Sequence, residues 1–86
     1  MDNSGLELAE EIIKNGERQA ARIRQQMVNL ISAEPLARID YVEIVDPQTL
    51  EPLVTIDGDA LVAVAVYFGR TRLIDNLRFI SGVIEK

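Results

Sequence analysis

The feature that most constrains the fold is an uncharged run of nine residues, Ala60–Phe68, which ends at a glycine. The short connection Gly69-Arg70 follows at once, and the apolar pair Leu73 and Ile74 comes soon after it. Two apolar runs joined by a short connection that contains glycine are typical of a β-hairpin. The sequence therefore predicts two antiparallel strands, over residues 60–68 and about 71–79.

A third strand is predicted over residues 39–45, because the segment IDYVEIV is rich in β-branched and aromatic side chains. Asp46-Pro47 then fits a helix N-cap followed by proline at the first helical position, which predicts a turn or a one-turn helix through Leu50. Pro52 excludes a long element there. The triplet Asp57-Gly58-Asp59 is typical of a turn before the next strand.

Before these strands, apolar or small residues recur at steps of three and four, which indicates a helical stripe. Asn15-Gly16 interrupts the stripe with a pair that commonly ends a helix. We therefore expect one helix to about Lys14 and a second over about residues 17–33, closed by Pro35. One long kinked helix is the alternative. The stripe consists of Leu6, Ala9, Ile13, Gly16, Ala20, Ile23, Met27 and Leu30.

Together these segments predict an α+β fold, in which two N-terminal helices pack on a small three-stranded antiparallel sheet. With 86 residues, the chain has room for a single domain. Residues 1–5 and 81–86 are expected to be irregular. The start Met1-Asp2-Asn3-Ser4 is typical of a chain begun just before a domain boundary, so an excised domain is expected.

Composition excludes several classes of function. A net charge of −5 argues against a nucleic-acid partner, since no cluster of cations could neutralise phosphates. No apolar run approaches the roughly 20 residues that cross a bilayer, and the first residues are acidic, so a cytoplasmic protein without a membrane partner is expected. The chain contains no cysteine and no histidine, which excludes disulfides, thiolate or imidazole metal ligands, and catalysis by either side chain.

Candidate site residues are few. The charged residues between positions 40 and 59 are all acidic, but they lack the ligand spacing of a calcium loop, so a solvated edge is expected rather than a metal site. Arg70 and Arg72 form a polar cluster at the predicted hairpin, where they could contact an anion or a partner domain. In the alternative, Arg72 pairs with a carboxylate on a neighbouring strand, because Asp75 lies on the other face. No residue is expected to be catalytic, cofactor-binding or metal-ligating.

The segments RIDYVEIVDPQTLEPL and GRTRLIDN, with the acidic turn and apolar strand between them, resemble in order and spacing the C-terminal domain of the pantothenate synthetase (pantoate-beta-alanine ligase) family. The resemblance extends from about Leu6 to Leu77. It implies a parent enzyme that joins pantoate to β-alanine through a pantoyl adenylate, using ATP and Mg²⁺, in the synthesis of vitamin B5 and coenzyme A. That parent is expected to be a cytoplasmic homodimer.

The family's nucleotide-binding groups lie mainly on an N-terminal Rossmann-like domain with a histidine-containing phosphate motif, which this chain lacks. The resemblance therefore implies that residues 1–86 form a lid over the cleft of that N-terminal domain, inactive alone and without a cofactor of their own. Closing a lid protects an acyl-adenylate from water. Arg70 and Arg72 are expected to face the nucleotide cleft. The alternative is a free-standing interaction module that dimerises through the helical stripe, without catalysis.

Overall fold

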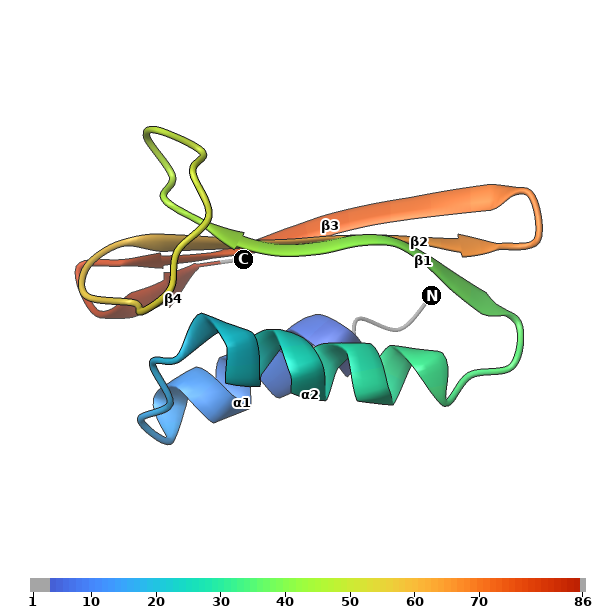
Figure 1. The fold of residues 1–86 in the computed structure, drawn as a ribbon, viewed down its shortest axis with the longest axis horizontal. Helices are drawn as coiled ribbons and strands as arrows, with labels where there is room; N and C mark the ends of the chain where they lie inside the picture. Colours follow the sequence, from blue (N-terminus) through green and yellow to red (C-terminus); the bar gives the residue numbers. More distant parts are fainter. Residues whose placement is uncertain (1–3, 86) are drawn as a thin grey trace.

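The computed structural model describes residues 4–85 and arranges them in two layers (Figure 1). Two helices cover one face of an antiparallel sheet, whose strands follow the order β1-β2-β3-β4. The α+β fold class is therefore confirmed, with one short strand more than the sequence predicts. The elements are α1 (Ser4–Lys14), α2 (Ala20–Ser32), β1 (Ala37–Val45), β2 (Ala60–Phe68), β3 (Thr71–Ile80) and β4 (Val83–Glu85).

The two helices are separate, as the Asn15-Gly16 pair predicts. Gly16 has a φ of 102°, a left-handed conformation that side chains with a Cβ rarely adopt, and its N–H donates to the carbonyl of Ile13. The helices then pack closely, since a Cβ placed on Gly5 would lie 3.1 Å from the side chain of Ile31. Glycine at this position allows the close approach.

Helix α2 begins at Ala20, about three residues later than predicted. The N–H of Ala20 donates to the carbonyl of Val54, and the N–H of Ile56 donates to the carbonyl of Arg18. Residues 18–20 thus run beside residues 54–56 in an extended pairing. A segment engaged in this way cannot also form the first turn of a helix, so the helix starts after it.

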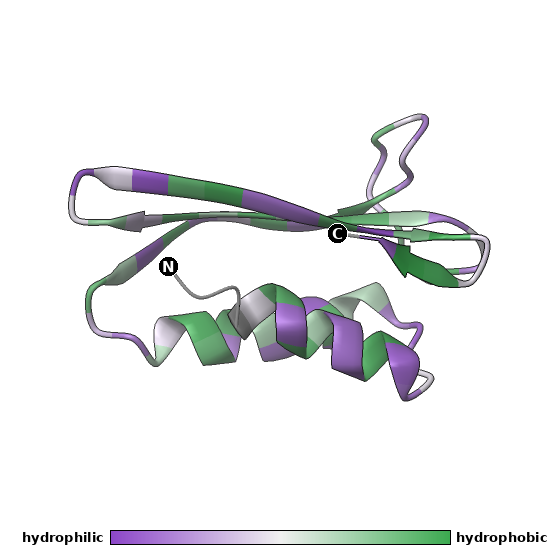
Figure 2. Cartoon of the chain, turned by 180° about the vertical axis from the view of Figure 1, so that it is seen from behind, coloured by the Kyte–Doolittle hydropathy of each residue, from purple (hydrophilic) through white to green (hydrophobic). Residues whose placement is uncertain are grey.

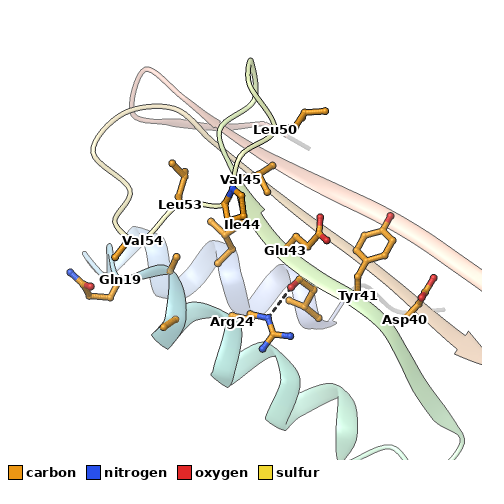
Figure 3. Close-up of a pocket in the computed structure, with 14 residues that line it drawn as sticks. Gln19, Arg24, Asp40, Tyr41, Glu43, Ile44, Val45, Leu50, Leu53 and Val54 are labelled. Atoms are coloured by element: carbon orange, nitrogen blue, oxygen red, sulfur yellow. Dashed lines mark hydrogen bonds between the residues drawn. The ribbon is translucent and has the colours of Figure 1, made fainter.

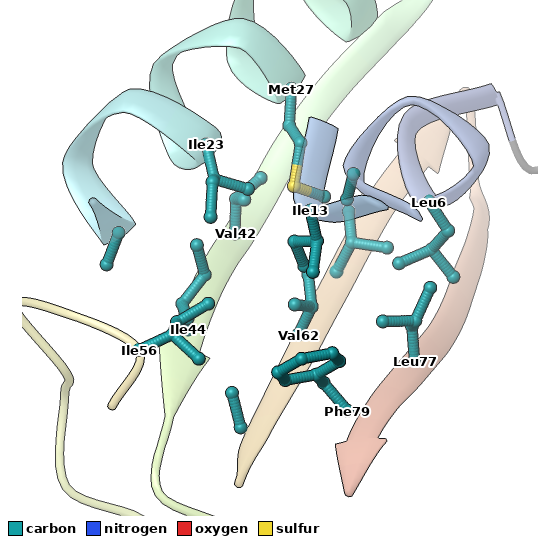
Figure 4. Close-up of a cluster of buried hydrophobic side chains, with 14 of the residues drawn as sticks. Leu6, Ile13, Ile23, Met27, Val42, Ile44, Ile56, Val62, Leu77 and Phe79 are labelled. Atoms are coloured by element: carbon teal, nitrogen blue, oxygen red, sulfur yellow. The ribbon is translucent and has the colours of Figure 1, made fainter. Parts of the chain in front are cut away.

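The helical stripe packs on the sheet of its own chain, and its members from Leu6 to Met27 are buried except for Gly16 (Figure 4). The expected stripe is wrong at its end, where Leu30 is 40% exposed and Ile31 is 8% exposed. A step of four residues from Met27 keeps the apolar face in line, because a helix has about 3.6 residues per turn. The principal core residues are Leu6, Ala9, Ile13, Ala20, Ile23, Met27 and Ile31 from the helices and Val42, Ile44, Val62, Val64, Val66, Leu77 and Phe79 from the sheet.

Arg18 ties the connection between the helices to this core. Its Nη1 donates to the carbonyl oxygens of Ile13, at 2.7 Å, and Glu17, at 3.0 Å. The carbonyl of Ile13 lies in the last turn of α1, where carbonyls lack helical partners. The Arg18 guanidinium also lies 5.0 Å from the centroid of the Phe79 ring, a favourable cation–π distance. One side chain therefore caps α1 and covers a core ring.

Strands β2 and β3 form the predicted hairpin, and β2 has the bounds expected from the sequence. Phe68 pairs with Thr71 across Gly69-Arg70, and Gly69 has a φ of 63°. Side chains alternate between the face that the helices cover and the opposite face, which we call the outer face. Figure 2 shows that the strands are largely hydrophobic, with hydrophilic residues interspersed along them.

Strand β1 pairs with the other side of β2 and contains a bulge. Ile39 lies opposite Val66 and Tyr41 lies opposite Ala65, so Asp40 is the extra residue between them. A bulge shifts the alternation of side chains by one position. Arg38 and Tyr41 lie on either side of the bulge, and the shift places both of them on the outer face.

The C-terminal segment forms a strand, which corrects the expectation of an irregular end. Ser81 has a φ of 52° and Gly82 a φ of 80°, and the turn they form pairs Ile80 with Val83. Two-residue hairpin turns with positive φ at both positions match the twist of the flanking strands. The N–H of Ser81 also donates to Asp59 Oδ1 at 2.9 Å.

The chain ends and the connections differ in part from what the sequence predicts. Residues 4 and 5 belong to α1, whereas Met1-Asp2-Asn3 and Lys86 lie outside the described residues. The segment after Asp46 is a turn and not a helix, and Asp57-Gly58 forms a bend. Within residues 4–85, neither helix has the length and apolar character that a membrane span requires.

Candidate functional site

The two residues proposed from the sequence, Arg70 and Arg72, have different environments. Arg70 lies in the turn of the β2–β3 hairpin, is exposed, and has no ion-pair or hydrogen-bond partner among residues 4–85. Its guanidinium is therefore available to an anion. Arg72 lies one position inside the strand, on the outer face, and is held by neighbouring side chains.

Arg72 pairs with Asp40. Its Nε and Nη2 donate to Asp40 Oδ2 at 3.0 Å and 2.7 Å, and the hydrogen bond with Asp40 is the main cause that raises the pKa of Arg72. The expectation that Arg72 meets a carboxylate other than Asp75 is confirmed. The partner is not on a neighbouring strand, however, because Asp40 lies on β1 and β2 runs between them. The bulge at Asp40 and the small side chain of Ala65 on β2 explain this reach.

Two tyrosines extend the pair into a cluster on the outer face. Arg38 of β1 lies opposite Tyr67 of β2, which in turn lies opposite Arg72 of β3. The Arg38 guanidinium is 4.8 Å from the Tyr67 ring centroid, and the Arg72 guanidinium is 5.9 Å from that of Tyr41. Both distances allow cation–π attraction. We call Arg38, Asp40, Tyr41, Tyr67 and Arg72 the arginine–tyrosine cluster.

The outer face beside this cluster is partly apolar. Across the three long strands, Tyr41 lies opposite Ala65, and Ala65 lies opposite Ile74, which is 56% exposed. Ala65 and Ala63 therefore give the outer face of β2 small side chains at these positions. Tyrosine and arginine are the residue types that are enriched where proteins bind each other. This face is therefore suited to binding another protein surface.

The acidic residues between positions 40 and 59 do not converge. Asp40 binds Arg72, Asp46 caps the turn that follows β1, and Asp59 accepts the N–H of Ser81. Among residues 4–85, no group of three or more carboxylates is placed to hold a metal ion. Local structure uses three of these carboxylates.

Sequence reasoning found Arg72 and its type of partner, but it missed Arg38, Tyr41 and Tyr67 as members of one cluster. The aromatic and basic residue types are a signal, since both are common at interfaces. Their proximity depends on the pairing of β1 with β2 and on the bulge. These two features join segments that lie far apart in the sequence.

Known proteins that resemble this chain in sequence and fold are pantothenate synthetases. A family model described as pantoate-beta-alanine ligase matches residues 3–78. The pantothenate synthetase of Pelotomaculum thermopropionicum is 56% identical over 71 residues, 83% of this chain and 25% of that protein. The pantothenate synthetase of Heliobacterium modesticaldum is 51% identical over 72 residues, 84% of this chain and 26% of that protein. The crystal structure of pantothenate synthetase from Thermus thermophilus matches with a TM-score of 0.77 and 35% identity, over 86% of this chain and 26% of that chain. The chain thus spans about a quarter of the length of these relatives.

Proposed function

Since the chain belongs to the pantoate-beta-alanine ligase family, we propose that it is the C-terminal lid domain of such a ligase. The parent enzyme condenses pantoate with β-alanine to make pantothenate, in the cytoplasm and as a homodimer, and consumes ATP in the presence of Mg²⁺. The names of the relatives support this activity, and the quarter of their length that the chain spans supports its role as one domain of the enzyme.

The reaction has two steps. The carboxylate of pantoate attacks the α-phosphorus of ATP, and pyrophosphate leaves. The amine of β-alanine then attacks the acyl carbon of pantoyl adenylate, which forms the amide and releases AMP. Water can attack the same carbon, which returns pantoate and releases AMP without forming the amide, so that the ATP is wasted. A closed lid is useful at this point because it keeps water out while the amine attacks.

The observation that carries the lid role is the uneven covering of the sheet. Both helices lie on one face of the sheet (Figure 1). The opposite face presents the arginine–tyrosine cluster and the exposed side chain of Ile74. Faces between mobile domains are moderately polar and resemble transient protein interfaces. In this proposal the outer face closes on the N-terminal Rossmann-like domain, which holds ATP and Mg²⁺, and the chain alone is inactive.

The activity is tested with a chimera in which this chain replaces the matching segment of the Pelotomaculum thermopropionicum enzyme. We expect the chimera to make pantothenate. Without the segment, the truncated enzyme should make less pantothenate and should release more AMP per pantothenate formed, because water reaches the adenylate. A folded chimera that makes no pantothenate would contradict the proposed function, as would a truncated enzyme with unchanged coupling.

Arg70 and Arg72 are proposed to contribute differently to closure. Arg70 reaches an anionic group at the nucleotide cleft, and Arg72 holds Asp40 and Tyr41 in place for contact with the other domain. Replacing both with alanine in the chimera should raise the KM for ATP or pantoate by about tenfold, the scale of one lost hydrogen bond to a charged group. Steady-state kinetics measure this effect.

The matched control is Arg78→Ala. Arg78 lies on the outer face of the same strand, is exposed, and pairs with Leu61 at the far end of β2 from the hairpin turn. Its replacement should leave both KM values unchanged. If the double variant keeps its KM values while remaining folded, Arg70 and Arg72 do not face the cleft.

A further inference from the structure

The loop between β1 and β2 is held rigidly at its first turn. Asp46 Oδ1 accepts the N–H groups of Gln48, at 2.8 Å, and Thr49, at 3.0 Å, and these backbone bonds lower the pKa of Asp46 because they favour the carboxylate. The N–H of Leu50 donates to the Asp46 carbonyl at 2.8 Å, and the N–H of Asp46 donates to the Glu51 carbonyl at 2.9 Å. The side chain, the N–H and the carbonyl of Asp46 therefore all form hydrogen bonds within the turn.

This braced turn presents an apolar side chain to solvent. Leu50 is 64% exposed and has a φ of 61°, the left-handed conformation that is unfavourable for residues with a Cβ. Glycine or asparagine would adopt this backbone conformation more easily than leucine and would expose less apolar surface to water. The leucine makes the turn more strained and exposes apolar surface, and no contact among residues 4–85 explains either cost. Strain of this kind is concentrated at functional positions.

The turn rises from the sheet on the side opposite the helices, as the yellow-green loop of Figure 1 shows. Leu50 stands at the upper end of an open groove of about 590 Å³ that follows the edge of β1 (Figure 3). Tyr41 and Asp40 line the same groove, so the groove is continuous with the arginine–tyrosine cluster. Val54, which is 80% exposed, adds a second apolar side chain to its wall.

The groove is not a site where a partner could add a strand to the edge of β1. Arg24 Nε donates to the carbonyl of Val42 at 2.9 Å, and the N–H of Leu53 donates to the carbonyl of Ile44 at 2.9 Å. Strand addition requires free edge groups in register, and these two acceptors are taken. A partner at this surface must therefore be recognised by side chains.

We infer that Leu50, held by its braced turn, is an apolar anchor that inserts into the remaining part of the full-length ligase chain and seats the lid beside the arginine–tyrosine cluster. This inference rests on the proposed function. In the relatives, the part of the chain outside the matched segment is about three times as long as the segment itself. That remaining part is the partner into which Leu50 inserts. A second copy of this chain is disfavoured, since each copy has a net charge of −5.

The test compares Leu50→Gly with the unchanged chimera. Glycine removes the side chain and relieves the left-handed backbone, so the unfolding temperature should stay the same or rise. We expect kcat/KM for pantothenate formation to fall by about tenfold, which corresponds to about 1.4 kcal/mol, and the AMP released per pantothenate to increase. Leu50→Asn, which also tolerates the left-handed backbone, should behave in the same way.

Leu36→Asn is the matched control. Leu36 is 75% exposed, lies before β1, and is not part of the groove, so its replacement should change neither turnover nor coupling. If Leu50→Gly turns over and couples like the unchanged chimera, the anchor is refuted while the proposed function stands. If the chimera itself makes no pantothenate, both are refuted. Concentration-dependent dimers of the chain that Leu50→Gly abolishes, with chimera kinetics unaffected, would identify a second copy as the occupant and also refute the inference.

Discussion

Replacing Ile23 with alanine is expected to lower the free energy of unfolding of the chain by about 3 kcal/mol. Ile23 is fully buried between α2 and the sheet, and truncation leaves a cavity that a close-packed core cannot fill. Domains of this size are stabilised by roughly 5–10 kcal/mol, so the loss is a large share of the total. Urea unfolding followed by circular dichroism measures the change in midpoint at constant slope.

Leu30→Ala is the control for this prediction, because it removes a similar side chain from the same helix. Leu30 is 40% exposed, so its truncation should cost less than about 1 kcal/mol. The comparison also tests the position of the helix, since the sequence pattern includes Leu30 in the buried stripe and the structure buries Ile31 in its place. Equal losses for Ile23→Ala and Leu30→Ala would contradict the observed orientation of α2.

The second large effect is expected for Arg18→Ala, at about 2 kcal/mol of unfolding free energy. The variant leaves the carbonyls of Ile13 and Glu17 without their side-chain donor and uncovers the ring of Phe79. Arg18→Lys should recover only part of the loss, because an ammonium lacks the planar guanidinium that donates to both carbonyls while it lies over the ring. Thermal unfolding of the three proteins gives the order.

Arg22→Ala serves as the comparison. Arg22 contacts Glu17 at 3.8 Å with its side chain 74% exposed, and exposed ion pairs contribute little to stability. Its removal should leave the unfolding temperature almost unchanged. If Arg18→Ala and Arg22→Ala had the same unfolding temperature, the cap on α1 and the contact with Phe79 would contribute nothing to stability.

Local signals explain which parts of the fold could be predicted. The β2–β3 hairpin is specified by an uncharged run that stops at Gly69, and the separation of the helices by Gly16, whose positive φ ends α1. The start of α2 could not be predicted in the same way, because it depends on pairing between residues 18–20 and 54–56. The turn before β4 does have a local signal in Ser81-Gly82. Strand β4 itself has only three residues, which is too short to show an alternating pattern.

The candidate site depended more on long-range structure. Arg70 and Arg72 were identifiable because they adjoin the predicted hairpin turn. Arg38 joins them only through the register of β1 on β2, and the bulge at Asp40 decides which face it shares. Leu50 carries no signal in the sequence PQTLEP, since its left-handed backbone follows from bonds that converge on Asp46.

The protected edge of β1 has a consequence for the proteins around this one. An unpaired strand edge can recruit strands of other molecules and begin aggregation. A domain that opens and closes as proposed bares this edge in every catalytic cycle, at the concentrations of a living cell. Because Arg24 and Leu53 already occupy the carbonyls of Val42 and Ile44, a foreign strand finds no continuous ladder to join. In the proposed lid role, this edge is therefore protected at Val42 and Ile44 against pairing with other molecules.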